Sequence, residues 1–192
     1  MKHIILASNS PRRKELLAGL DVDFEVRVLD GIDESYPAEL PVQDIAEYIS
    51  RKKAVAYRET MGDDELVITA DTVVVLGRQV MGKPKDDADA CRMLRLLSGQ
   101  VHQVITGVTL TTRERQRSFS VKTDVTFKAL SEQEINYYVS RYHPLDKAGA
   151  YGIQEWIGHI GVTGLNGSYY NVMGLPVQRI YEVLKSEYLW NK

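Results

Sequence analysis

The stretch that decides the fold is Leu66 to Leu76, which reads LVITADTVVVL. Its apolar run is interrupted only by Thr69, Asp71 and Thr72. Such continuous apolar segments are typical of strands that are buried on both faces of a sheet. A carboxylate inside such a strand must be paired, bind a metal or be protonated, because an isolated buried charge is costly. Asp71 is therefore a candidate functional residue; the structural alternative is an aspartate that bridges backbone groups at a strand kink.

Strands and helices alternate along the rest of the chain. The sequence predicts further strands at Ile4–Ala7, Phe24–Val28, 101–112 and 117–128. It predicts helices that open at Ser10-Pro11, at Val42, at Asp86, at Ser131 and at Val177. The glycine-rich residues 149–174 predict short strands and turns. The pattern indicates an α/β fold, with a mixed twisted sheet flanked by helices and a single domain over residues 1–192.

Composition excludes several classes of protein. The 24 basic and 26 acidic residues give a net charge of -2, which argues against a nucleic-acid binder, because such proteins need a large positive surface. No apolar stretch approaches the roughly 20 residues that span a bilayer. The single cysteine, Cys91, cannot form an internal disulfide, and its place in a helical apolar pattern favours a structural thiol. We expect a cytoplasmic protein without a membrane or nucleic-acid partner.

The segment Ala7 to Arg13, ASNSPRR, is a candidate phosphate site. A buried strand runs into a polar turn and a helix starts at once, so that free backbone N–H groups point outward. Arg12 and Arg13 then occupy the first helical turn, where the helix dipole disfavours cations. A bound polyanion would remove that penalty. The alternative is a solvated basic helix start that a surface acid such as Glu15 neutralises.

Three further sets of charged residues are weaker candidates. Lys83 lies in the turn Gly82-Lys83-Pro84 and could point toward Asp71, although turn lysines are usually solvent-facing. Lys52 and Lys53 flank the apolar stripe of the helix at 42–58, where aliphatic packing at the edge of the core is the plainer explanation. Asp33 and Glu34 form a carboxylate pair that suits a hard metal, although acidic loops are commonly just solvated.

The segment Asp146 to Gln154, DKAGAYGIQ, mixes glycines with a few polar groups. Gly149 and Gly152 permit close approach of the backbone or unusual dihedral angles. Gln154 carries an amide that can meet the edge of a base with both a donor and an acceptor. Cations for phosphates, carboxylates for a metal and an amide for a base together indicate a nucleotide as the ligand.

Five motifs, taken in order, resemble the Maf family of nucleotide pyrophosphatases. They are Ala7–Arg13, Ala70-Asp71-Thr72, Gly82-Lys83-Pro84, Asp146–Gln154 and Gly174-Leu175-Pro176. Each motif alone is weak, but five in register cover essentially the whole chain. The resemblance implies an inosine triphosphate pyrophosphatase-like fold, with a cleft between two lobes.

The same resemblance implies roles for individual residues. Arginine after the first proline, Ala-Asp-Thr and Gly-Ile-Gln are similar to the subfamily that acts on dTTP and UTP. Its 7-methyl-GTP sister group is marked by a tryptophan after the proline, a glutamine after the aspartate and a glutamate near the third site, and we find none of these marks here. By resemblance, Asp71 is the proton acceptor, and the base is selected by Arg12, Thr72 and Gln154. Phosphate binding is assigned by resemblance to Ser8, Arg13, Lys53 and Lys83, and metal binding to Asp71 and Glu34.

The expected reaction is hydrolysis of a pyrimidine nucleoside triphosphate between its α- and β-phosphates, with Mg²⁺ or Mn²⁺. Cations and metal would stabilise the charge on the leaving pyrophosphate. The resemblance further implies a homodimer and a role in nucleotide-pool housecleaning that is linked to cell-division arrest. Two alternatives stay open: a purine-directed pyrophosphatase of the same fold, and a non-enzymatic division regulator that binds a nucleotide or a protein.

Overall fold

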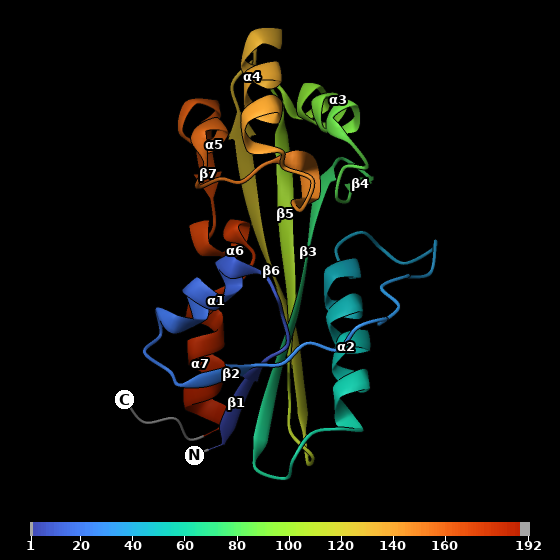
Figure 1. The fold of residues 1–192 in the computed structure, drawn as a ribbon, viewed down its shortest axis with the longest axis vertical. Helices are drawn as coiled ribbons and strands as arrows, with labels where there is room; N and C mark the ends of the chain where they lie inside the picture. Colours follow the sequence, from blue (N-terminus) through green and yellow to red (C-terminus); the bar gives the residue numbers. More distant parts are fainter. Residues whose placement is uncertain (1, 189–192) are drawn as a thin grey trace. The chain divides into compact units, whose positions relative to one another are not determined.

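The structure, a computed structural model, describes residues 2–188. Its strands are arranged in one seven-stranded sheet with the order β2-β1-β3-β5-β6-β7, and β4 pairs with β3. Strand β1 (His3–Leu6) pairs parallel with both β2 (Phe24–Val26) and β3 (Glu65–Leu76). Strands β4 (Gln79–Met81) and β7 (Val162–Asn166) pair antiparallel with β3 and β6 (Gln116–Phe127). The expected mixed α/β sheet with flanking helices is confirmed (Figure 1).

The chain forms two compact units. Unit 1 contains the residues up to Asp71, Thr106–Val121 and the residues from Gly174 on, and unit 2 contains Thr72–Ile105 and Lys122–Met173. Strands β3, β5 (Val101–Thr111) and β6 contribute residues to both units. The expectation of a single domain over residues 1–192 stays a prediction.

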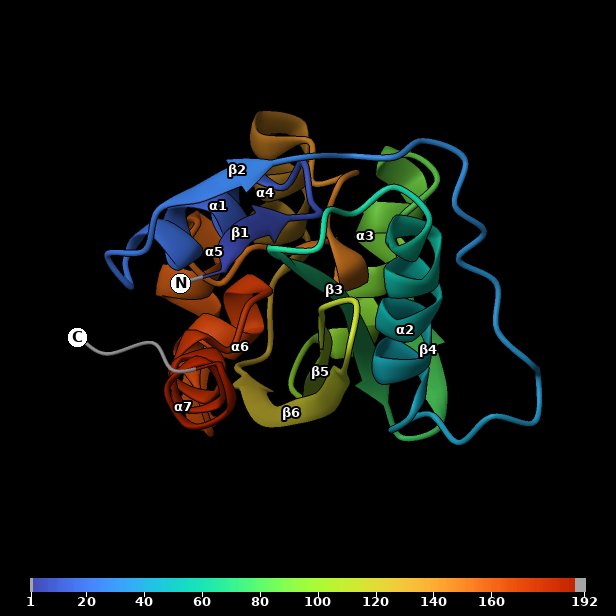
Figure 2. The same ribbon diagram turned by 90° about the horizontal axis from the view of Figure 1, so that it is seen from below.

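In unit 1, helices cover both faces of the strands. Helix α2 (Ile45–Arg58) lies against the face that carries Gly107 and Thr109, since the buried Ser50 hydroxyl lies 2.8 Å from the Thr109 hydroxyl. Helix α7 (Val177–Glu187) lies on the other face, where the Arg179 guanidinium stacks 5.7 Å from the ring centroid of Phe119. Alternating side chains of a strand point to opposite faces, so the two helices enclose the strands (Figures 1 and 2).

Helix α1 (Pro11–Ala18) forms as its sequence predicts. The Ser10 hydroxyl accepts a hydrogen bond from the Arg13 backbone N–H at 3.4 Å, and Pro11 occupies the first turn. Leu16 and Leu17 supply the buried side of the helix. The helix therefore begins directly after β1 and the polar turn, as the ASNSPRR segment indicates.

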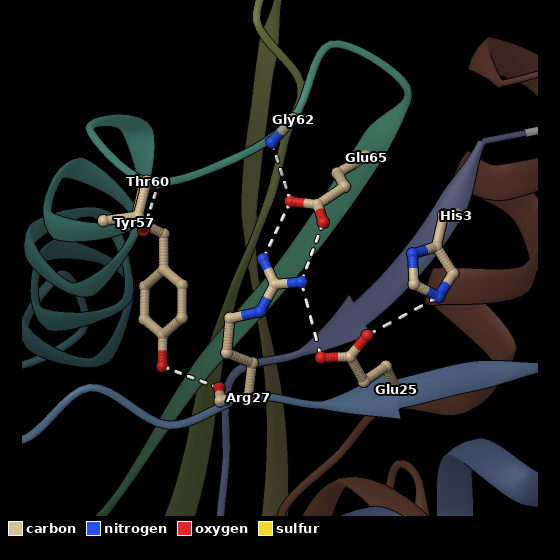
Figure 3. Close-up of polar contacts among 7 residues, drawn as sticks. All are labelled: His3, Glu25, Arg27, Tyr57, Thr60, Gly62 and Glu65. Carbon is tan, nitrogen blue, oxygen red and sulfur yellow. Dashed lines mark hydrogen bonds and ion pairs between the residues drawn. The ribbon is translucent and has the colours of Figure 1, made fainter.

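An ion-pair network fixes β2 to the start of β3 in unit 1 (Figure 3). The Arg27 guanidinium donates to both Glu65 carboxylate oxygens, at 2.8 and 2.9 Å. Glu65 also accepts from the Gly62 backbone N–H at 2.9 Å. The Tyr57 hydroxyl donates to the Arg27 carbonyl at 2.8 Å and so joins α2 to the same segment. The loop that carries Glu34 therefore begins next to Arg27, whose side chain and carbonyl are both held by hydrogen bonds.

Unit 2 has its own hydrophobic core. Helices α3 (Asp87–Leu97) and α4 (Glu132–Tyr142) pack against buried residues of β5 and β6, including Val104, Val125 and Phe127. Ser131 and Glu134 form the capping box that the sequence predicts at the start of α4.

Residues 149–174 differ from the expectation of short strands and turns. They contain the end of the 3-10 turn η1 (Ala148–Ala150), helix α5 (Trp156–Gly161), β7 and helix α6 (Tyr169–Met173). These two helices are only six and five residues long, so their apolar period is too brief to predict them. Tertiary packing supports them: buried Ile157 belongs to the unit 2 core, and Asn171 donates to the Val104 carbonyl at 3.1 Å. Within residues 2–188, no helix is long and apolar enough to cross a membrane.

Candidate active site

Asp71 lies in β3 of unit 1, where an otherwise buried strand becomes partly accessible. The residues before it, Leu66 to Ala70, are buried, whereas the Asp71 side chain is 15% exposed. Its carboxylate is paired: the Lys53 ammonium donates to Asp71 Oδ1 at 2.8 Å. Of the possibilities that the sequence left open, the structure therefore has Asp71 paired with a cation.

Lys53 connects two carboxylates of unit 1. Its Nζ atom lies 2.8 Å from Asp71 Oδ1 and 2.9 Å from Glu34 Oε1. The Glu34 side chain is 55% exposed and the Lys53 side chain only 13%, so the ammonium binds one carboxylate at the protein edge and one farther inside. Lys53 therefore contributes its charge to this group, in addition to the packing of its aliphatic stem that the sequence suggests.

The two acids of the Asp33-Glu34 pair face different lysines. Asp33 accepts from Lys52 Nζ at 2.7 Å and from the Ser35 hydroxyl at 2.7 Å. These hydrogen bonds, that of Lys52 first, hold the pKa of Asp33 well below its usual range. Of these two acids, only Glu34 joins the group around Asp71, and its role as a metal ligand stays a prediction.

The placement of Lys53 depends on how α2 packs on the strands. A Cβ atom on Gly107 would lie 2.2 Å from the Glu47 backbone nitrogen, so this glycine lets α2 approach the sheet closely. The Thr69 hydroxyl donates to the Ser50 carbonyl at 2.7 Å, and both residues are fully buried. Close packing and buried hydroxyls together fix the helix turn that carries Lys53.

Arg13 joins three segments of unit 1. Its guanidinium donates from Nε to the Gly174 carbonyl at 2.8 Å and from Nη1 to the Ala70 carbonyl at 2.9 Å. Burial lowers the pKa of Arg13, and the nearby Asp71 carboxylate opposes that shift. Arg13 therefore orders the backbone next to Asp71, and its role in phosphate binding stays a prediction.

Ser8 and Arg12 lie at the start of α1. Ser8 is buried, and its hydroxyl accepts from the Ser10 backbone N–H at 3.2 Å, which closes the polar turn after β1. Arg12 is partly exposed in the first helical turn. Their roles in phosphate binding and base selection stay predictions.

The remaining predicted residues belong to unit 2. Thr72 directly follows Asp71 in β3, and Lys83 is exposed after β4. Gln154 lies in a turn that the Glu155 backbone N–H closes onto the Gly152 carbonyl at 3.0 Å. The Gln154 Oε1 atom is buried and has no hydrogen-bond partner within residues 2–188. An amide oxygen in that state suits a role in ligand recognition.

Sequence reasoning missed the residues that surround this turn. Tyr138, Lys147 and Glu155 meet there through side-chain contacts, although none was a candidate. The glycine at position 152 was the one available signal. A Cβ atom at that position would lie 2.9 Å from the Glu155 carboxyl carbon, so Gly152 leaves room for Glu155 to fold back.

The donor set around Asp71 fits a divalent cation that is shared with a substrate. Within residues 2–188, no three His, Cys, Asp or Glu side chains gather as a complete ligand set. Asp71 and Glu34 nevertheless converge on one cation, the Lys53 ammonium. Mg²⁺ in nucleotide sites is commonly held by one or two carboxylates together with substrate phosphates. Two convergent carboxylates satisfy that requirement.

We compared the sequence with known families and proteins. The chain matches the Maf family, described as Maf-like protein, over residues 3–187. It is 63% identical over 182 residues to the dTTP/UTP pyrophosphatase of Phocaeicola vulgatus, covering 95% of this chain and 94% of that protein. The dTTP/UTP pyrophosphatase of Bacteroides thetaiotaomicron is 62% identical with the same coverage.

One solved structure similar to the chain is the nucleoside-triphosphatase, or dITP/XTP pyrophosphatase, of Mycobacterium abscessus. It has a TM-score of 0.45 and 14% identity and covers 97% of this chain and 96% of that one. Likeness at this level decides neither fold nor activity. The family match and the curated relatives, in contrast, extend over nearly the whole sequence, and the chain therefore belongs to the Maf family.

Proposed function

We propose that this protein hydrolyses dTTP and UTP between the α- and β-phosphates, giving the nucleoside monophosphate and pyrophosphate. The observation that carries the proposal is the group formed by Asp71 on an otherwise buried strand, Lys53 in α2 and Glu34 in the loop after β2. The names of the curated relatives, dTTP/UTP pyrophosphatases at 63 and 62% identity, support the substrate class.

In the proposed reaction, the Asp71 carboxylate orients a water molecule and takes its proton. The oxygen of that water forms a bond to the α-phosphorus, and the bond from this phosphorus to the bridging oxygen breaks. Pyrophosphate leaves with the electron pair of the broken bond. Lys53, Arg12, Arg13 and Lys83 would stabilise the negative charge of the phosphates, which is the main contribution of protein groups in phosphoryl chemistry.

A divalent cation, Mg²⁺ or Mn²⁺, would be held by Asp71 and Glu34 and would neutralise charge on the phosphate oxygens. Asp71 cannot serve at once as the direct metal ligand and as the only base, so one of these roles would pass through a bridging water. Removal of divalent ions with EDTA is expected to abolish turnover, and added Mg²⁺ or Mn²⁺ is expected to restore it.

Base selection is assigned in this proposal to Arg12, Thr72 and Gln154. The Gln154 amide offers a donor and an acceptor to the uracil or thymine edge. A base with a mismatched pattern would leave these groups unpaired, which is the kind of mismatch that discriminates strongly between substrates. Modified pyrimidine nucleotides that keep this edge belong to the same expected class.

The test is a panel of natural and modified nucleoside triphosphates with Mg²⁺ or Mn²⁺, with monophosphate and pyrophosphate measured separately. Turnover of dTTP and UTP to these two products supports the proposal. Asp71→Asn should lower kcat by about 10²- to 10⁴-fold, the range for loss of a general base, and leave the thermal unfolding temperature nearly unchanged. Retained activity in this variant would reject the role of Asp71.

Other outcomes of the same panel would replace the proposal. A preference for inosine or xanthosine triphosphate would indicate the purine-directed reaction. Nucleotide binding without any turnover would favour a regulator. A homodimer and a link to cell-division arrest remain proposals that rest on the family resemblance, and a cytoplasmic location remains one that rests on composition. Light scattering on the purified protein tests the homodimer.

A further inference from the structure

The turn that carries Gln154 is held by a cluster of polar side chains that the proposed reaction does not use. This cluster, here called the turn clamp, consists of Tyr138, Lys147, Gly152 and Glu155, all in unit 2. Glu155 closes the turn through its backbone N–H and also folds its side chain back over Gly152. Gln154 therefore lies in a turn whose first and last residues, Gly152 and Glu155, are held by the clamp.

Tyr138 is the centre of the turn clamp. Its side chain is fully buried in α4, its hydroxyl donates to Glu155 Oε2, and the same hydroxyl accepts from the Gly152 backbone N–H at 3.1 Å. One hydroxyl thus holds both ends of the turn. Burial, followed by the hydrogen bond to Glu155, raises the pKa of Tyr138, so the hydroxyl remains a proton donor at neutral pH.

Lys147 completes the charge balance of the clamp. Its ammonium lies 3.1 Å from Glu155 Oε1 and 2.8 Å from Asp146 Oδ1, and Lys147 is itself buried. The Glu155 carboxylate thereby has a partner on each oxygen. A carboxylate with both oxygens engaged cannot rotate without breaking a hydrogen bond or an ion pair.

The turn that this clamp holds carries a side chain, that of Gln154, with a buried, unsatisfied acceptor. Gln154 Oε1 finds no partner within residues 2–188, which costs free energy unless a ligand supplies a donor. A fixed amide discriminates between bases because it cannot turn to suit a different donor and acceptor pattern. A mobile amide would lose that property.

We propose that Tyr138 and Glu155 are positioning residues for base selectivity, which hold the Gln154 amide in one orientation for the uracil or thymine edge. This inference rests on the proposed function. It predicts that breaking the clamp lowers the preference for UTP over CTP, because the Gln154 amide then adapts to either base. A clamp that merely stabilises unit 2 would leave this preference unchanged.

The test compares kcat/KM for UTP and CTP in Tyr138→Phe and in a matched control, Tyr137→Phe. Tyr138→Phe removes the hydroxyl and keeps the ring that stacks on Tyr142 at 5.0 Å. Tyr137 is the neighbouring residue of the same helix, and its side chain is half exposed. We expect the UTP/CTP ratio of kcat/KM to fall about tenfold in Tyr138→Phe, the effect of one hydrogen bond to a charged group, and to stay within twofold in the control.

A second variant keeps the inference testable if Tyr138→Phe does not fold. Glu155→Gln keeps the volume and one acceptor for Tyr138 but removes the charge that Lys147 neutralises. We expect a smaller fall in the ratio, about threefold, with thermal unfolding still cooperative. An equal fall of kcat/KM for UTP and CTP, or no change for either, would overturn the positioning role. Failure of the proposed function is distinct, because the unmodified protein would then not hydrolyse UTP at all.

Discussion

The two units hold their central candidate residues, Asp71 and Gln154, through different kinds of contact. In unit 1, Asp71 and Glu34 share the Lys53 ammonium at 2.8 and 2.9 Å near an accessible edge. In unit 2, Gln154 carries no charge, and its turn is held from the buried side by the neutral hydroxyl of Tyr138. A phosphate-binding cation must be able to exchange its partner. When a polyanion binds, the ion pair that the cation makes within the protein is replaced by an ion pair with a phosphate oxygen. A base requires a fixed neutral edge, because selectivity comes from unmet hydrogen bonds.

The largest of the following effects is expected when the Lys53 ammonium of unit 1 is removed. Lys53→Gln should lower kcat/KM for dTTP by about 10²-fold or more, because Asp71 and Glu34 lose their shared cation and the phosphates lose an electrostatic partner. Lys52→Gln is the matched control: it is the preceding residue, and it pairs with the exposed Asp33 instead. Steady-state kinetics on both variants make the comparison. Equal losses in the two variants would contradict the special role of Lys53.

The stability of unit 2 should depend more strongly on acid pH than the stability of unit 1. His102 is buried, with Nε2 2.7 Å from the Tyr151 hydroxyl, and burial lowers its pKa to about 4. In the unfolded chain the pKa is about 6.5, so the neutral form stabilises the fold above that pH. The free energy of unfolding should fall as pH drops from about 6.5 to about 4, by up to about 3 kcal/mol.

Denaturant unfolding followed by Trp156 fluorescence, in a Trp190→Phe background, measures this dependence. His102→Gln should flatten the pH profile between those values. His159→Gln, which changes an exposed histidine, should leave the profile as it is. A steep profile that persists in His102→Gln would assign the acid sensitivity to other groups.

An intermediate effect is expected where α2 packs closely on the sheet of unit 1. Gly107→Ala would place Cβ 2.2 Å from the Glu47 backbone nitrogen, so the helix must shift. We expect a loss of about 1–3 kcal/mol in the free energy of unfolding, as for overpacked cores, and reduced activity because α2 carries Lys53. Gly82→Ala serves as the stability control, since within residues 2–188 no atom beyond its two chain neighbours lies within 4 Å of the position that its methyl group would take. Unchanged stability in Gly107→Ala would show that the helix adjusts freely.

The smallest effect is expected for the ion pair of Figure 3. The Arg27 hydrogen bonds lower the pKa of Glu65, so this pair stabilises unit 1 above the ordinary glutamate pKa of about 4.3 and is lost as pH falls below it. Glu65→Gln should cost about 1 kcal/mol at pH 7, the upper range for partly exposed pairs. Chemical denaturation at pH 7 and pH 3 checks this, and the difference between the two proteins should shrink at pH 3.

Most elements of the fold could be predicted because their signals are local. The β3 segment reads as a buried strand from its apolar run, and the Ser10 cap and the Ser131–Glu134 capping box mark helix starts within three residues. The helices α5 and α6 could not be predicted, since each is shorter than two turns and depends on core packing in unit 2.

The sequence by itself determined which residue types were available: a carboxylate inside an apolar strand, arginines in a helix start, and an amide after a glycine. It also determined the family, because five motifs occur in one order. Only the tertiary structure decided that Lys53 pairs with Asp71 and Glu34 while Lys52 pairs with Asp33, and that Tyr138 holds the turn of Gln154. These partners are 14 to 19 residues apart, and such contacts depend on how helices pack on strands and loops, which no local pattern encodes.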